Sequence, residues 1–396
     1  MGRILVNIGI FTDTYYPQVS GVATSIKTLR EQLEKQGHQV YIFTTTDPKV
    51  DKDVYERNIF RFASIPFVSF TDRRIAVSGL FKAYQVAKEL NLDIVHTQTE
   101  FSLGWIGKFV AKNLKIPCVH TYHTMYEDYL HYVANGHLLR PYHVKQGTRA
   151  FCYHLTGVVA PSERVIKTLN GYGVKAPIRV IPTGVNVNHY AQHEEIDWRE
   201  KYGFPKKKKI LLSLSRLAYE KNIQEVIKTF PQILKAVPDS LLVIVGDGPA
   251  RESLELQTKN LGITDHVRFT GEIDNDIVYR YYQMADLFVS ASDSESQGLT
   301  YIEALAAGLK VVVKSSPYTD QLLDDPSLGV TFETEKQFVH FAENYLNHPV
   351  SFEDPEPRER KLYDISADHF GKQIVDFYKD SLVLYADREE SSSFSD

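Results

Sequence analysis

The chain has 396 residues, of which 43% are hydrophobic and 24% charged, and this globular composition is long enough for two domains with separate cores. No run of about 18 apolar residues occurs, so we expect no transmembrane helix. The N-terminus lacks a small-residue cleavage site, so we expect no signal peptide. Cys118 and Cys152 form no CxxC motif and are expected to be reduced thiols, as in a cytoplasmic protein.

The net charge of −5 is divided unevenly along the chain. Residues 1–190 contain 22 Lys and Arg against 14 Asp and Glu, a balance of +8. Residues 191–396 contain the remaining 23 against 36, a balance of −13. A basic half suits nucleic acid, an anionic membrane or phosphates. A chance division between two solvated surfaces explains the same numbers equally well.

Short β-branched runs alternate with longer amphipathic stretches along the whole chain. Near-continuous apolar strands that alternate with helices predict parallel sheets covered on both faces. We therefore expect an α/β fold of two doubly wound, Rossmann-like domains that face a shared cleft at the carboxyl ends of their strands. The predicted strands cover residues 3–11, 38–45, 92–97, 116–122, 156–160 and 178–182, then 209–215, 241–246, 266–271, 286–292 and 310–316.

The predicted domain boundaries follow from the same pattern. The first domain covers residues 1–188 and the second covers residues 189–365. A helical pattern over 361–385 predicts a C-terminal helix, and its part from 366 to 386 is expected to return to the first domain. The polar residues 387–396 predict a disordered tail.

Glycines and cations follow several predicted strands, where ligands of such sheets bind. Gly21 opens a helix whose first amides and dipole favour an anion, although a lone glycine is as well explained by a tight turn. Arg216 and Lys221 follow the strand over 209–215. The guanidinium of Arg216 can bind two phosphate oxygens at once, and the ammonium of Lys221 provides a compact positive charge for them. Two cations in a loop are more often solvent-facing. Gly246 lies in a "GDGP" turn that predicts either a backbone nest or a plain structural turn.

The stretch "ESQGLTYIEAL" places Glu295 before a glycine turn and Glu303 inside the helix that follows. Gly298 permits close approach of the backbone, and Leu299 and Thr300 present the first helix amides. The two carboxylates could accept hydrogen bonds from sugar hydroxyls on either side of a phosphate. The plainer interpretation is complementarity with the helix dipole, worth about 0.3–1 kcal/mol.

In this order, the motifs resemble the retaining GT-B glycosyltransferases of glycosyltransferase family 4, over essentially the whole chain. The resemblance implies that Arg216 and Lys221 hold the nucleotide diphosphate. It also implies that Glu303 takes the ribose hydroxyls and that Glu295 takes hydroxyls of the donor sugar. The family often has a glycine pair where this chain has Ser20 and Gly21. The donor-binding residues implied are Ser20, Gly21, Arg216, Lys221, Gly246, Glu295, Gly298, Leu299, Thr300 and Glu303.

The segment "VHTYHTMYEDYLHYV", together with residues 11–29, is similar to bacterial diacylglycerol glucosyltransferases, which make membrane glycolipids. His123 corresponds to the family histidine that reaches the donor hexose, so the implied catalytic set is His123, Arg216, Lys221 and Glu295. The implied activity is transfer of glucose from UDP-glucose to 1,2-diacylglycerol with retention and without a cofactor. Other acceptors remain open, namely a glycosylated diacylglycerol, another lipid or a soluble molecule. So do a sugar-nucleotide epimerase of the same architecture and a non-catalytic nucleotide-sugar binder.

Histidines and aspartates also raise the question of a metal. Six histidines fall within residues 120–154, but their spacing is irregular and HExxH is absent, so we expect no metal site. The "DND" at 274–276 resembles the aspartate motif that binds a divalent ion in other glycosyltransferases, yet Asp274 is expected to be a helix N-cap. No RNA-binding module pattern occurs, so we expect no nucleic-acid partner.

Two segments bear on membrane binding. Residues 73–90 predict an amphipathic helix that lies in an anionic interface or, as the pattern alone favours, packs on the sheet. Residues 126–153 mix tyrosines with basic residues, which suits an interface. The resemblance to lipid glucosyltransferases then implies a peripheral enzyme on the inner face of the cell membrane. Its membrane and acceptor residues are expected to be Arg73, Arg74, Val77, Leu80, Phe81, Lys82, Tyr84 and Lys88.

Overall fold

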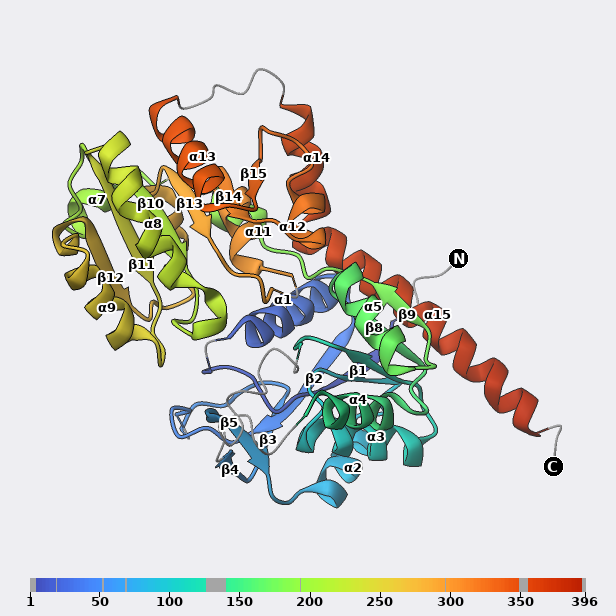
Figure 1. Ribbon diagram of the computed structural model, residues 1–396. Helices are drawn as coiled ribbons and strands as arrows, with labels where there is room; N and C mark the ends of the chain where they lie inside the picture. Colours follow the sequence, from blue (N-terminus) through green and yellow to red (C-terminus); the bar gives the residue numbers. More distant parts are fainter. Residues whose placement is uncertain are drawn as a thin grey trace. The chain divides into compact units, whose positions relative to one another are not determined.

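The chain divides into two compact units in the computed structural model (Figure 1). Unit 1 consists of Met1–Gly184 and Ala367–Asp396, and unit 2 consists of Val185–Ser366. The structure describes residues 5–18, 20–51, 53–67, 70–125, 140–192, 194–295, 297–348 and 355–393.

Unit 1 is built on a seven-stranded parallel sheet with the order β3-β2-β1-β6-β7-β8-β9. Its strands are β1 (Asn7–Phe11), β2 (Gln39–Thr45), β3 (Ile59–Phe62), β6 (Ile94–Thr97), β7 (Cys118–Thr121), β8 (Gly157–Ala160) and β9 (Ile178–Val180). The helices are α1 (Gly21–Lys35), α2 (Leu80–Glu89), α3 (Ser102–Leu114), α4 (Pro141–Cys152), α5 (Glu163–Tyr172) and α15 (Ala367–Ser393).

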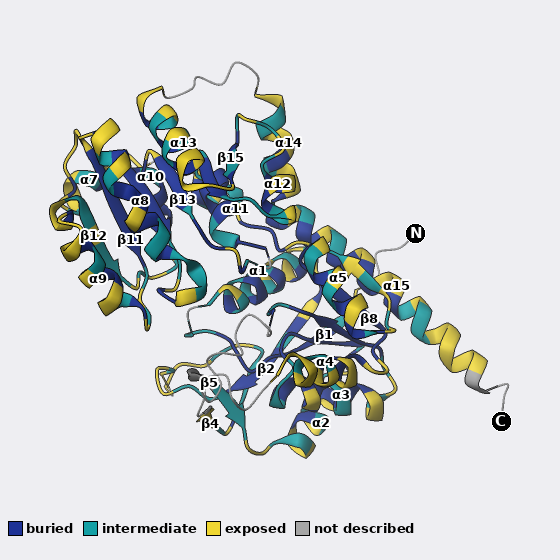
Figure 2. Cartoon of the chain, in the orientation of Figure 1, coloured by how far each residue is buried: buried dark blue, intermediate teal, exposed yellow. Residues whose placement is uncertain are grey.

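Side chains of alternate residues enter two cores, one on each face of the sheet. On β1, Ile8 and Ile10 pack with residues of α1 and α15, whereas Phe11 packs with residues of α2 and α3. This period of two follows from the pleat of a strand, and burial on both faces explains the continuous apolar runs. Figure 2 shows the strands of the sheet as buried and the outer helix surfaces as exposed.

Residues 73–90 do not form the single helix that the sequence predicted. Arg73 and Arg74 lie in β5 (Phe70–Ala76), which pairs antiparallel with β4 (Ser64–Phe67) in a separate hairpin. Helix α2 begins only at Leu80, after Gly79, whose φ of 114° is a left-handed conformation that glycine adopts without strain. The predicted interfacial segment over 126–153 lies partly outside the described residues, because 126–139 are not described.

Unit 2 repeats the architecture with a six-stranded parallel sheet in the order β12-β11-β10-β13-β14-β15. The α/β prediction is thus confirmed, although the sequence pattern missed β3 and β15. The strands are β10 (Lys209–Leu214), β11 (Ser240–Val245), β12 (Val267–Gly271), β13 (Leu287–Ser290), β14 (Val311–Lys314) and β15 (Gly329–Phe332). The α-helices are α6 (Val187–Ala191), α7 (Trp198–Lys201), α8 (Ile223–Ala236), α9 (Arg251–Asn260), α10 (Tyr279–Met284), α11 (Leu299–Ala306), α12 (Pro317–Leu322), α13 (Glu335–Asn347) and α14 (Glu356–Asp364).

The C-terminal helical pattern is two helices rather than one. Val185 bridges Ser366 between α14 and α15, and its amide donates to the carbonyl of Ile365 at 2.8 Å. Helix α15 then packs beside α1 within unit 1, as Figure 1 shows, and continues to Ser393. The prediction of a disordered tail from residue 387 was therefore wrong for residues 387–393, because α15 continues to Ser393, and Arg388, Glu389 and Glu390 are good helix formers.

Within the described residues, no helix combines the length and the apolar character that crossing a bilayer requires.

Candidate active site

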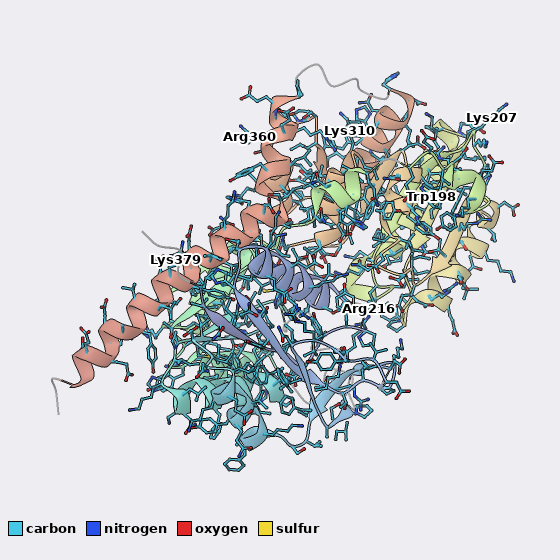
Figure 3. The ribbon with its side chains drawn as sticks, turned by 180° about the vertical axis from the view of Figure 1, so that it is seen from behind. Trp198, Lys207, Arg216, Lys310, Arg360 and Lys379 are labelled. Carbon is cyan, nitrogen blue, oxygen red and sulfur yellow. The ribbon has the colours of Figure 1, made fainter. Side chains whose placement is uncertain are left out.

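Most of the predicted donor residues come together at one edge of the unit 2 sheet. Arg216 follows β10, Gly246 follows β11, and Glu295 lies in the loop after β13. Because the strands of this sheet are parallel, their carboxyl ends share one edge, and ligands of such sheets bind at this edge. Arg216, which is labelled in Figure 3, has an exposed side chain.

Lys221 and Glu295 form an ion pair, although 74 residues separate them in the chain. The Lys221 Nζ lies 2.6 Å from Glu295 Oε1, and the two side chains are only 16% and 19% exposed. The neighbouring loops are also joined, because the Ser294 hydroxyl donates to the carbonyl of Glu220 at 3.1 Å. The structure therefore brings together the predicted phosphate-binding and hexose-binding residues.

The glycine turn after β11 is required by close packing. A Cβ atom on Gly246, whose φ is 130°, would lie 1.9 Å from the carbonyl oxygen of Ser215. A Cβ atom on Gly248 would lie 2.5 Å from the carbonyl oxygen of Leu217. The Leu217 amide donates to the carbonyl of Asp247 at 2.9 Å. These contacts support the interpretation of a structural turn, and they fix the loop that carries Arg216.

Glu303 is buried in α11, the helix that begins after Gly298 in a left-handed conformation (φ 68°). Leu299 and Thr300 form its first turn and are half-buried. The Tyr282 hydroxyl donates to Glu303 Oε2 at 2.6 Å. Burial raises the pKa of the Glu303 carboxyl to about 7, against the opposing effect of the tyrosine hydrogen bonds.

Sequence reasoning missed Tyr282. A signal was present in the run "YRYY" over 279–282, because buried tyrosine hydroxyls need hydrogen-bond partners. The sequence did not indicate which acceptor each hydroxyl would find.

The predicted residues of unit 1 lie at the carboxyl edge of its own sheet. Ser20 is the N-cap of α1, and its Oγ accepts from the amide of Ala23 at 3.1 Å. Gly21 is the first helical residue, as predicted. His123 follows β7, and its Nε2 lies 2.7 Å from Oε1 of Gln98, the residue directly after β6.

The surroundings of His123 keep the imidazole neutral. Burial, and secondarily the neighbouring His120, lower the pKa of His123 to about 3. The hydrogen bond to Gln98 holds the ring, since an amide oxygen accepts only from a protonated ring nitrogen. His123 is therefore suited to neutral hydrogen bonding rather than to carrying a positive charge, and Gln98 is a second residue that the sequence did not reveal.

Asp13 and His120, two other polar residues near this edge, have hydrogen-bond partners within unit 1. The Thr99 hydroxyl donates to Asp13 Oδ2 at 2.6 Å, and the Leu103 amide donates to the same carboxylate at 3.1 Å. Burial raises the pKa of Asp13, which lies after β1 and closes the N-terminus of α3. His120 Nε2 lies 3.1 Å from Glu100 Oε1.

Across the described part of the chain, no group of three or more His, Cys, Asp or Glu side chains could hold a metal ion. Asp274 is not a helix N-cap, because α10 begins only at Tyr279. Its Oδ1 instead accepts from the amide of Asp276 at 3.0 Å and stabilises a turn.

The expected membrane-facing side chains are divided between the core and the surface. Leu80 and Tyr84 pack against the unit 1 core, so they do not form one outer face with Phe81, which is 74% exposed. Val77, Lys82 and Lys88 are exposed, whereas Arg74 donates to the hydroxyl and carbonyl oxygens of Ser64 at 2.9 and 2.7 Å. The side chain of Arg73 lies outside the described residues.

Comparison with known proteins identifies the family. Residues 19–189 match the family model described as Glycosyltransferase Family 4, and residues 194–356 match Glycosyl transferases group 1. The chain is 47% identical to the alpha-monoglucosyldiacylglycerol synthase of Streptococcus pneumoniae over 96% of this chain and 86% of the relative. The chain belongs to the family 4 glycosyltransferases. As a member of this family, it is a hexosyltransferase that uses a nucleotide sugar as substrate.

Further comparisons agree with this assignment. This glycosyltransferase is 32% identical to the alpha-monoglucosyldiacylglycerol synthase of Acholeplasma laidlawii, over 86% of this chain and 89% of the relative. Its fold is similar to that of the sucrose-phosphate synthase from Thermosynechococcus elongatus, with a TM-score of 0.75, 21% identity and coverage of 94% and 98% of the two chains. Anabaena HepE, solved with UDP-glucose, gives a TM-score of 0.70 at 18% identity, with coverage of 94% and 99%. These likenesses establish the GT-B fold.

Proposed function

We propose that this glycosyltransferase moves glucose from UDP-glucose to 1,2-diacylglycerol, with retention of the anomeric configuration. The observation that carries the proposal is the 47% identity to a protein named alpha-monoglucosyldiacylglycerol synthase, over 96% of the chain. A second protein of the same name shares 32% identity. The word alpha in the names of both relatives supports retention. Glucose is α-linked in UDP-glucose, and an α-glucoside product keeps that configuration.

The residues at the unit 2 edge suit this chemistry. A nucleoside diphosphate is a good leaving group, so the reaction needs cations that stabilise its developing charge more than it needs a general acid. Arg216 and Lys221 supply these cations, and Glu303 accepts hydrogen bonds from the ribose. Glu295 accepts from the hexose, and the diphosphate would compete with its 2.6 Å ion pair for Lys221.

His123 of unit 1 completes the proposed set as a neutral hydrogen-bonding group for the donor hexose. Its pKa of about 3 keeps the ring uncharged at physiological pH. Because Nε2 donates to Gln98, a sugar hydroxyl would donate its hydrogen bond to Nδ1 of the neutral ring. Ser20, Gly21, Gly246, Gly298, Leu299 and Thr300 would contact the donor through backbone or capping groups.

The lipid acceptor requires docking on a membrane, because diacylglycerol stays in the bilayer. We assign docking to the exposed part of the α2 region, namely Val77, Phe81, Lys82 and Lys88. Each basic side chain near an anionic surface contributes about 1 kcal/mol, and salt screens this within roughly 10 Å. The protein would then act from the cytoplasmic side as a peripheral enzyme.

The activity is tested by offering UDP-glucose and UDP-galactose to vesicles that contain diacylglycerol, glucosyldiacylglycerol or neither. We expect a lipid product only with UDP-glucose and diacylglycerol, and the anomeric proton coupling of the product should identify the α-linkage. A β-linked product would overturn retention. Transfer to glucosyldiacylglycerol alone, or to a soluble acceptor alone, would show that diacylglycerol is not the acceptor.

Docking is tested separately by vesicle sedimentation. The variant with Lys82→Gln, Lys88→Gln and Phe81→Ala should bind anionic vesicles more weakly and bind UDP normally. The matched control carries Lys207→Gln and Lys235→Gln, two exposed lysines of unit 2. If both variants lose vesicle binding equally, or if binding ignores salt and lipid charge, the α2 region is not the docking surface.

A further inference from the structure

Glu303 occupies an unusual environment for a carboxylate. It is 5% exposed within α11, where its neighbours Ile302, Ala304 and Leu305 are buried apolar residues. No ion pair with a lysine, arginine or histidine reaches Glu303 from the described residues. A buried carboxylate without a counter-charge depends on hydrogen-bond donors, so the groups that donate to it decide its orientation.

Tyr282 is such a donor, and it is held rigidly. Its side chain is fully buried on α10, and its hydroxyl donates to Glu303 Oε2 at 2.6 Å. Its ring centroid lies 5.8 Å from that of Tyr190 and 6.0 Å from that of Phe288. Burial raises the pKa of Tyr282 well above its ordinary range, so the phenol stays protonated and can donate a hydrogen bond to the carboxylate.

We propose that Tyr282 is a positioning residue for nucleotide recognition, which fixes the carboxylate plane of Glu303 so that it can accept both hydroxyls of the ribose diol. The inference rests on the proposed function, in which Glu303 binds the ribose. Two hydroxyls on neighbouring carbons can donate to one carboxylate only when its plane has the correct orientation. Tyr282 occupies one lone pair of Oε2 and, together with the hydrogen bond from Tyr190, restricts rotation about the terminal torsion, which is otherwise soft.

The experiment compares two ligands that differ only in the diol. UDP and 2′,3′-dideoxy-UDP are titrated calorimetrically into the wild type, Tyr282→Phe, Glu303→Gln and the double variant. We expect Tyr282→Phe to weaken UDP about tenfold, as for a lost hydrogen bond to a charged group, and to leave dideoxy-UDP within twofold. The double variant should bind UDP no more weakly than Glu303→Gln alone, because Tyr282 acts through Glu303.

Tyr279→Phe is the matched control. Tyr279 lies on the same helix, is 3% exposed, and donates its hydroxyl to the carboxylate of Glu194. Its removal therefore costs a tyrosine–carboxylate hydrogen bond, here to the exposed Glu194, without touching Glu303. We expect this variant to bind both nucleotides within twofold of the wild type.

The outcomes separate the inference from its premise. If Glu303→Gln weakens UDP and dideoxy-UDP equally, Glu303 does not read the diol, and both the ribose assignment and the inference are wrong. If Glu303→Gln discriminates the two ligands but Tyr282→Phe does not, only the inference is overturned. Equal weakening of both ligands by Tyr282→Phe would assign Tyr282 a purely structural role and also overturn it. Lipid transfer is not measured, so these results are independent of the acceptor.

Discussion

When the strands are counted within each sheet, the sheets of unit 1 and unit 2 share the order 3-2-1-4-5-6, and unit 1 adds the strand β9 at the end. The carboxyl edges of the two sheets nevertheless carry different chemistry. In unit 1, His123 and Gln98 form a neutral hydrogen-bonded pair at 2.7 Å. The carboxylate of Asp13 accepts a hydrogen bond from the Leu103 amide at the N-terminus of α3. In unit 2, the edge carries Arg216 together with the Lys221–Glu295 ion pair.

Under the proposed function, the topology sets the edge of each sheet at which the donor binds, and the side chains after the strands select which part of the donor binds there. An edge with cations suits the diphosphate, since ionised groups make the stronger hydrogen bonds to phosphate oxygens. An edge with neutral donors and acceptors suits sugar hydroxyls, which carry no charge. Three of the following predictions test this division between the two units, and one tests the ionisation of the buried Glu303.

The largest effect is expected from the unit 2 cations. Arg216→Ala or Lys221→Ala should lower kcat/KM by roughly 10²–10³, because the loss of one contact to the leaving diphosphate costs about 2–4 kcal/mol. Steady-state kinetics with UDP-glucose measures this effect. Lys207→Ala is the control, because Lys207 is an exposed lysine in a separate lysine run before β10. Near-normal turnover in both variants would show that Arg216 and Lys221 do not stabilise the leaving diphosphate.

The buried Glu303 should give a pH-dependent stability effect. Its pKa is raised from 4.5 to about 7, so the favourable neutral form contributes fully below about pH 4.5, and this contribution is lost as the pH rises through about 7. Glu303→Gln, which cannot ionise, should therefore gain stability relative to the wild type by about 1–3 kcal/mol between pH 5 and pH 8. Urea unfolding at both pH values measures the difference, and a constant difference would contradict the raised pKa.

The neutral pair of unit 1 should matter for transfer but not for UDP. Gln98→Leu should lower the transfer rate about tenfold, because it leaves the His123 N–H without its acceptor and lets the ring turn. The affinity for UDP should stay within twofold of the wild type. A loss of UDP affinity as large as the loss of transfer rate would show that the residues at the unit 1 edge also contribute to nucleotide binding.

The smallest effect concerns the competition for Lys221. In Glu295→Gln the ion pair at 2.6 Å becomes at most a neutral hydrogen bond, which competes less strongly with the diphosphate for Lys221. We expect UDP to bind a few times more tightly, since a partly exposed ion pair contributes about 1 kcal/mol at most, while glucose transfer falls. Calorimetry with UDP decides the point, and weaker UDP binding would show that Glu295 supports the nucleotide rather than competing with it.

Most of the fold could be predicted from the sequence, because buried apolar residues recur at the spacing of a strand or a helix, and this spacing is visible within a short segment. The apolar runs after residues 38 and 240 became β2 and β11, and Gly21 opened α1 as expected. The predictions failed where the local signal was weak. Strands β3 and β15 lie at the edges of their sheets and are only partly buried, so they lack the continuous apolar runs of the central strands. The change from β5 to α2 depends on the left-handed Gly79 rather than on any change in amphipathic pattern.

The candidate site divides in the same way. Motif order and the family resemblance were enough to propose Arg216, Lys221, Glu295 and Glu303, of which the first three follow the strands β10 and β13. Only the tertiary structure decided that Lys221 meets Glu295 across 74 residues, and that Tyr282 rather than a cation meets the buried Glu303. Such pairs depend on strand order and on how helices pack against the sheet. Local sequence patterns specify which residues are buried, but they do not specify which buried polar group will face which partner.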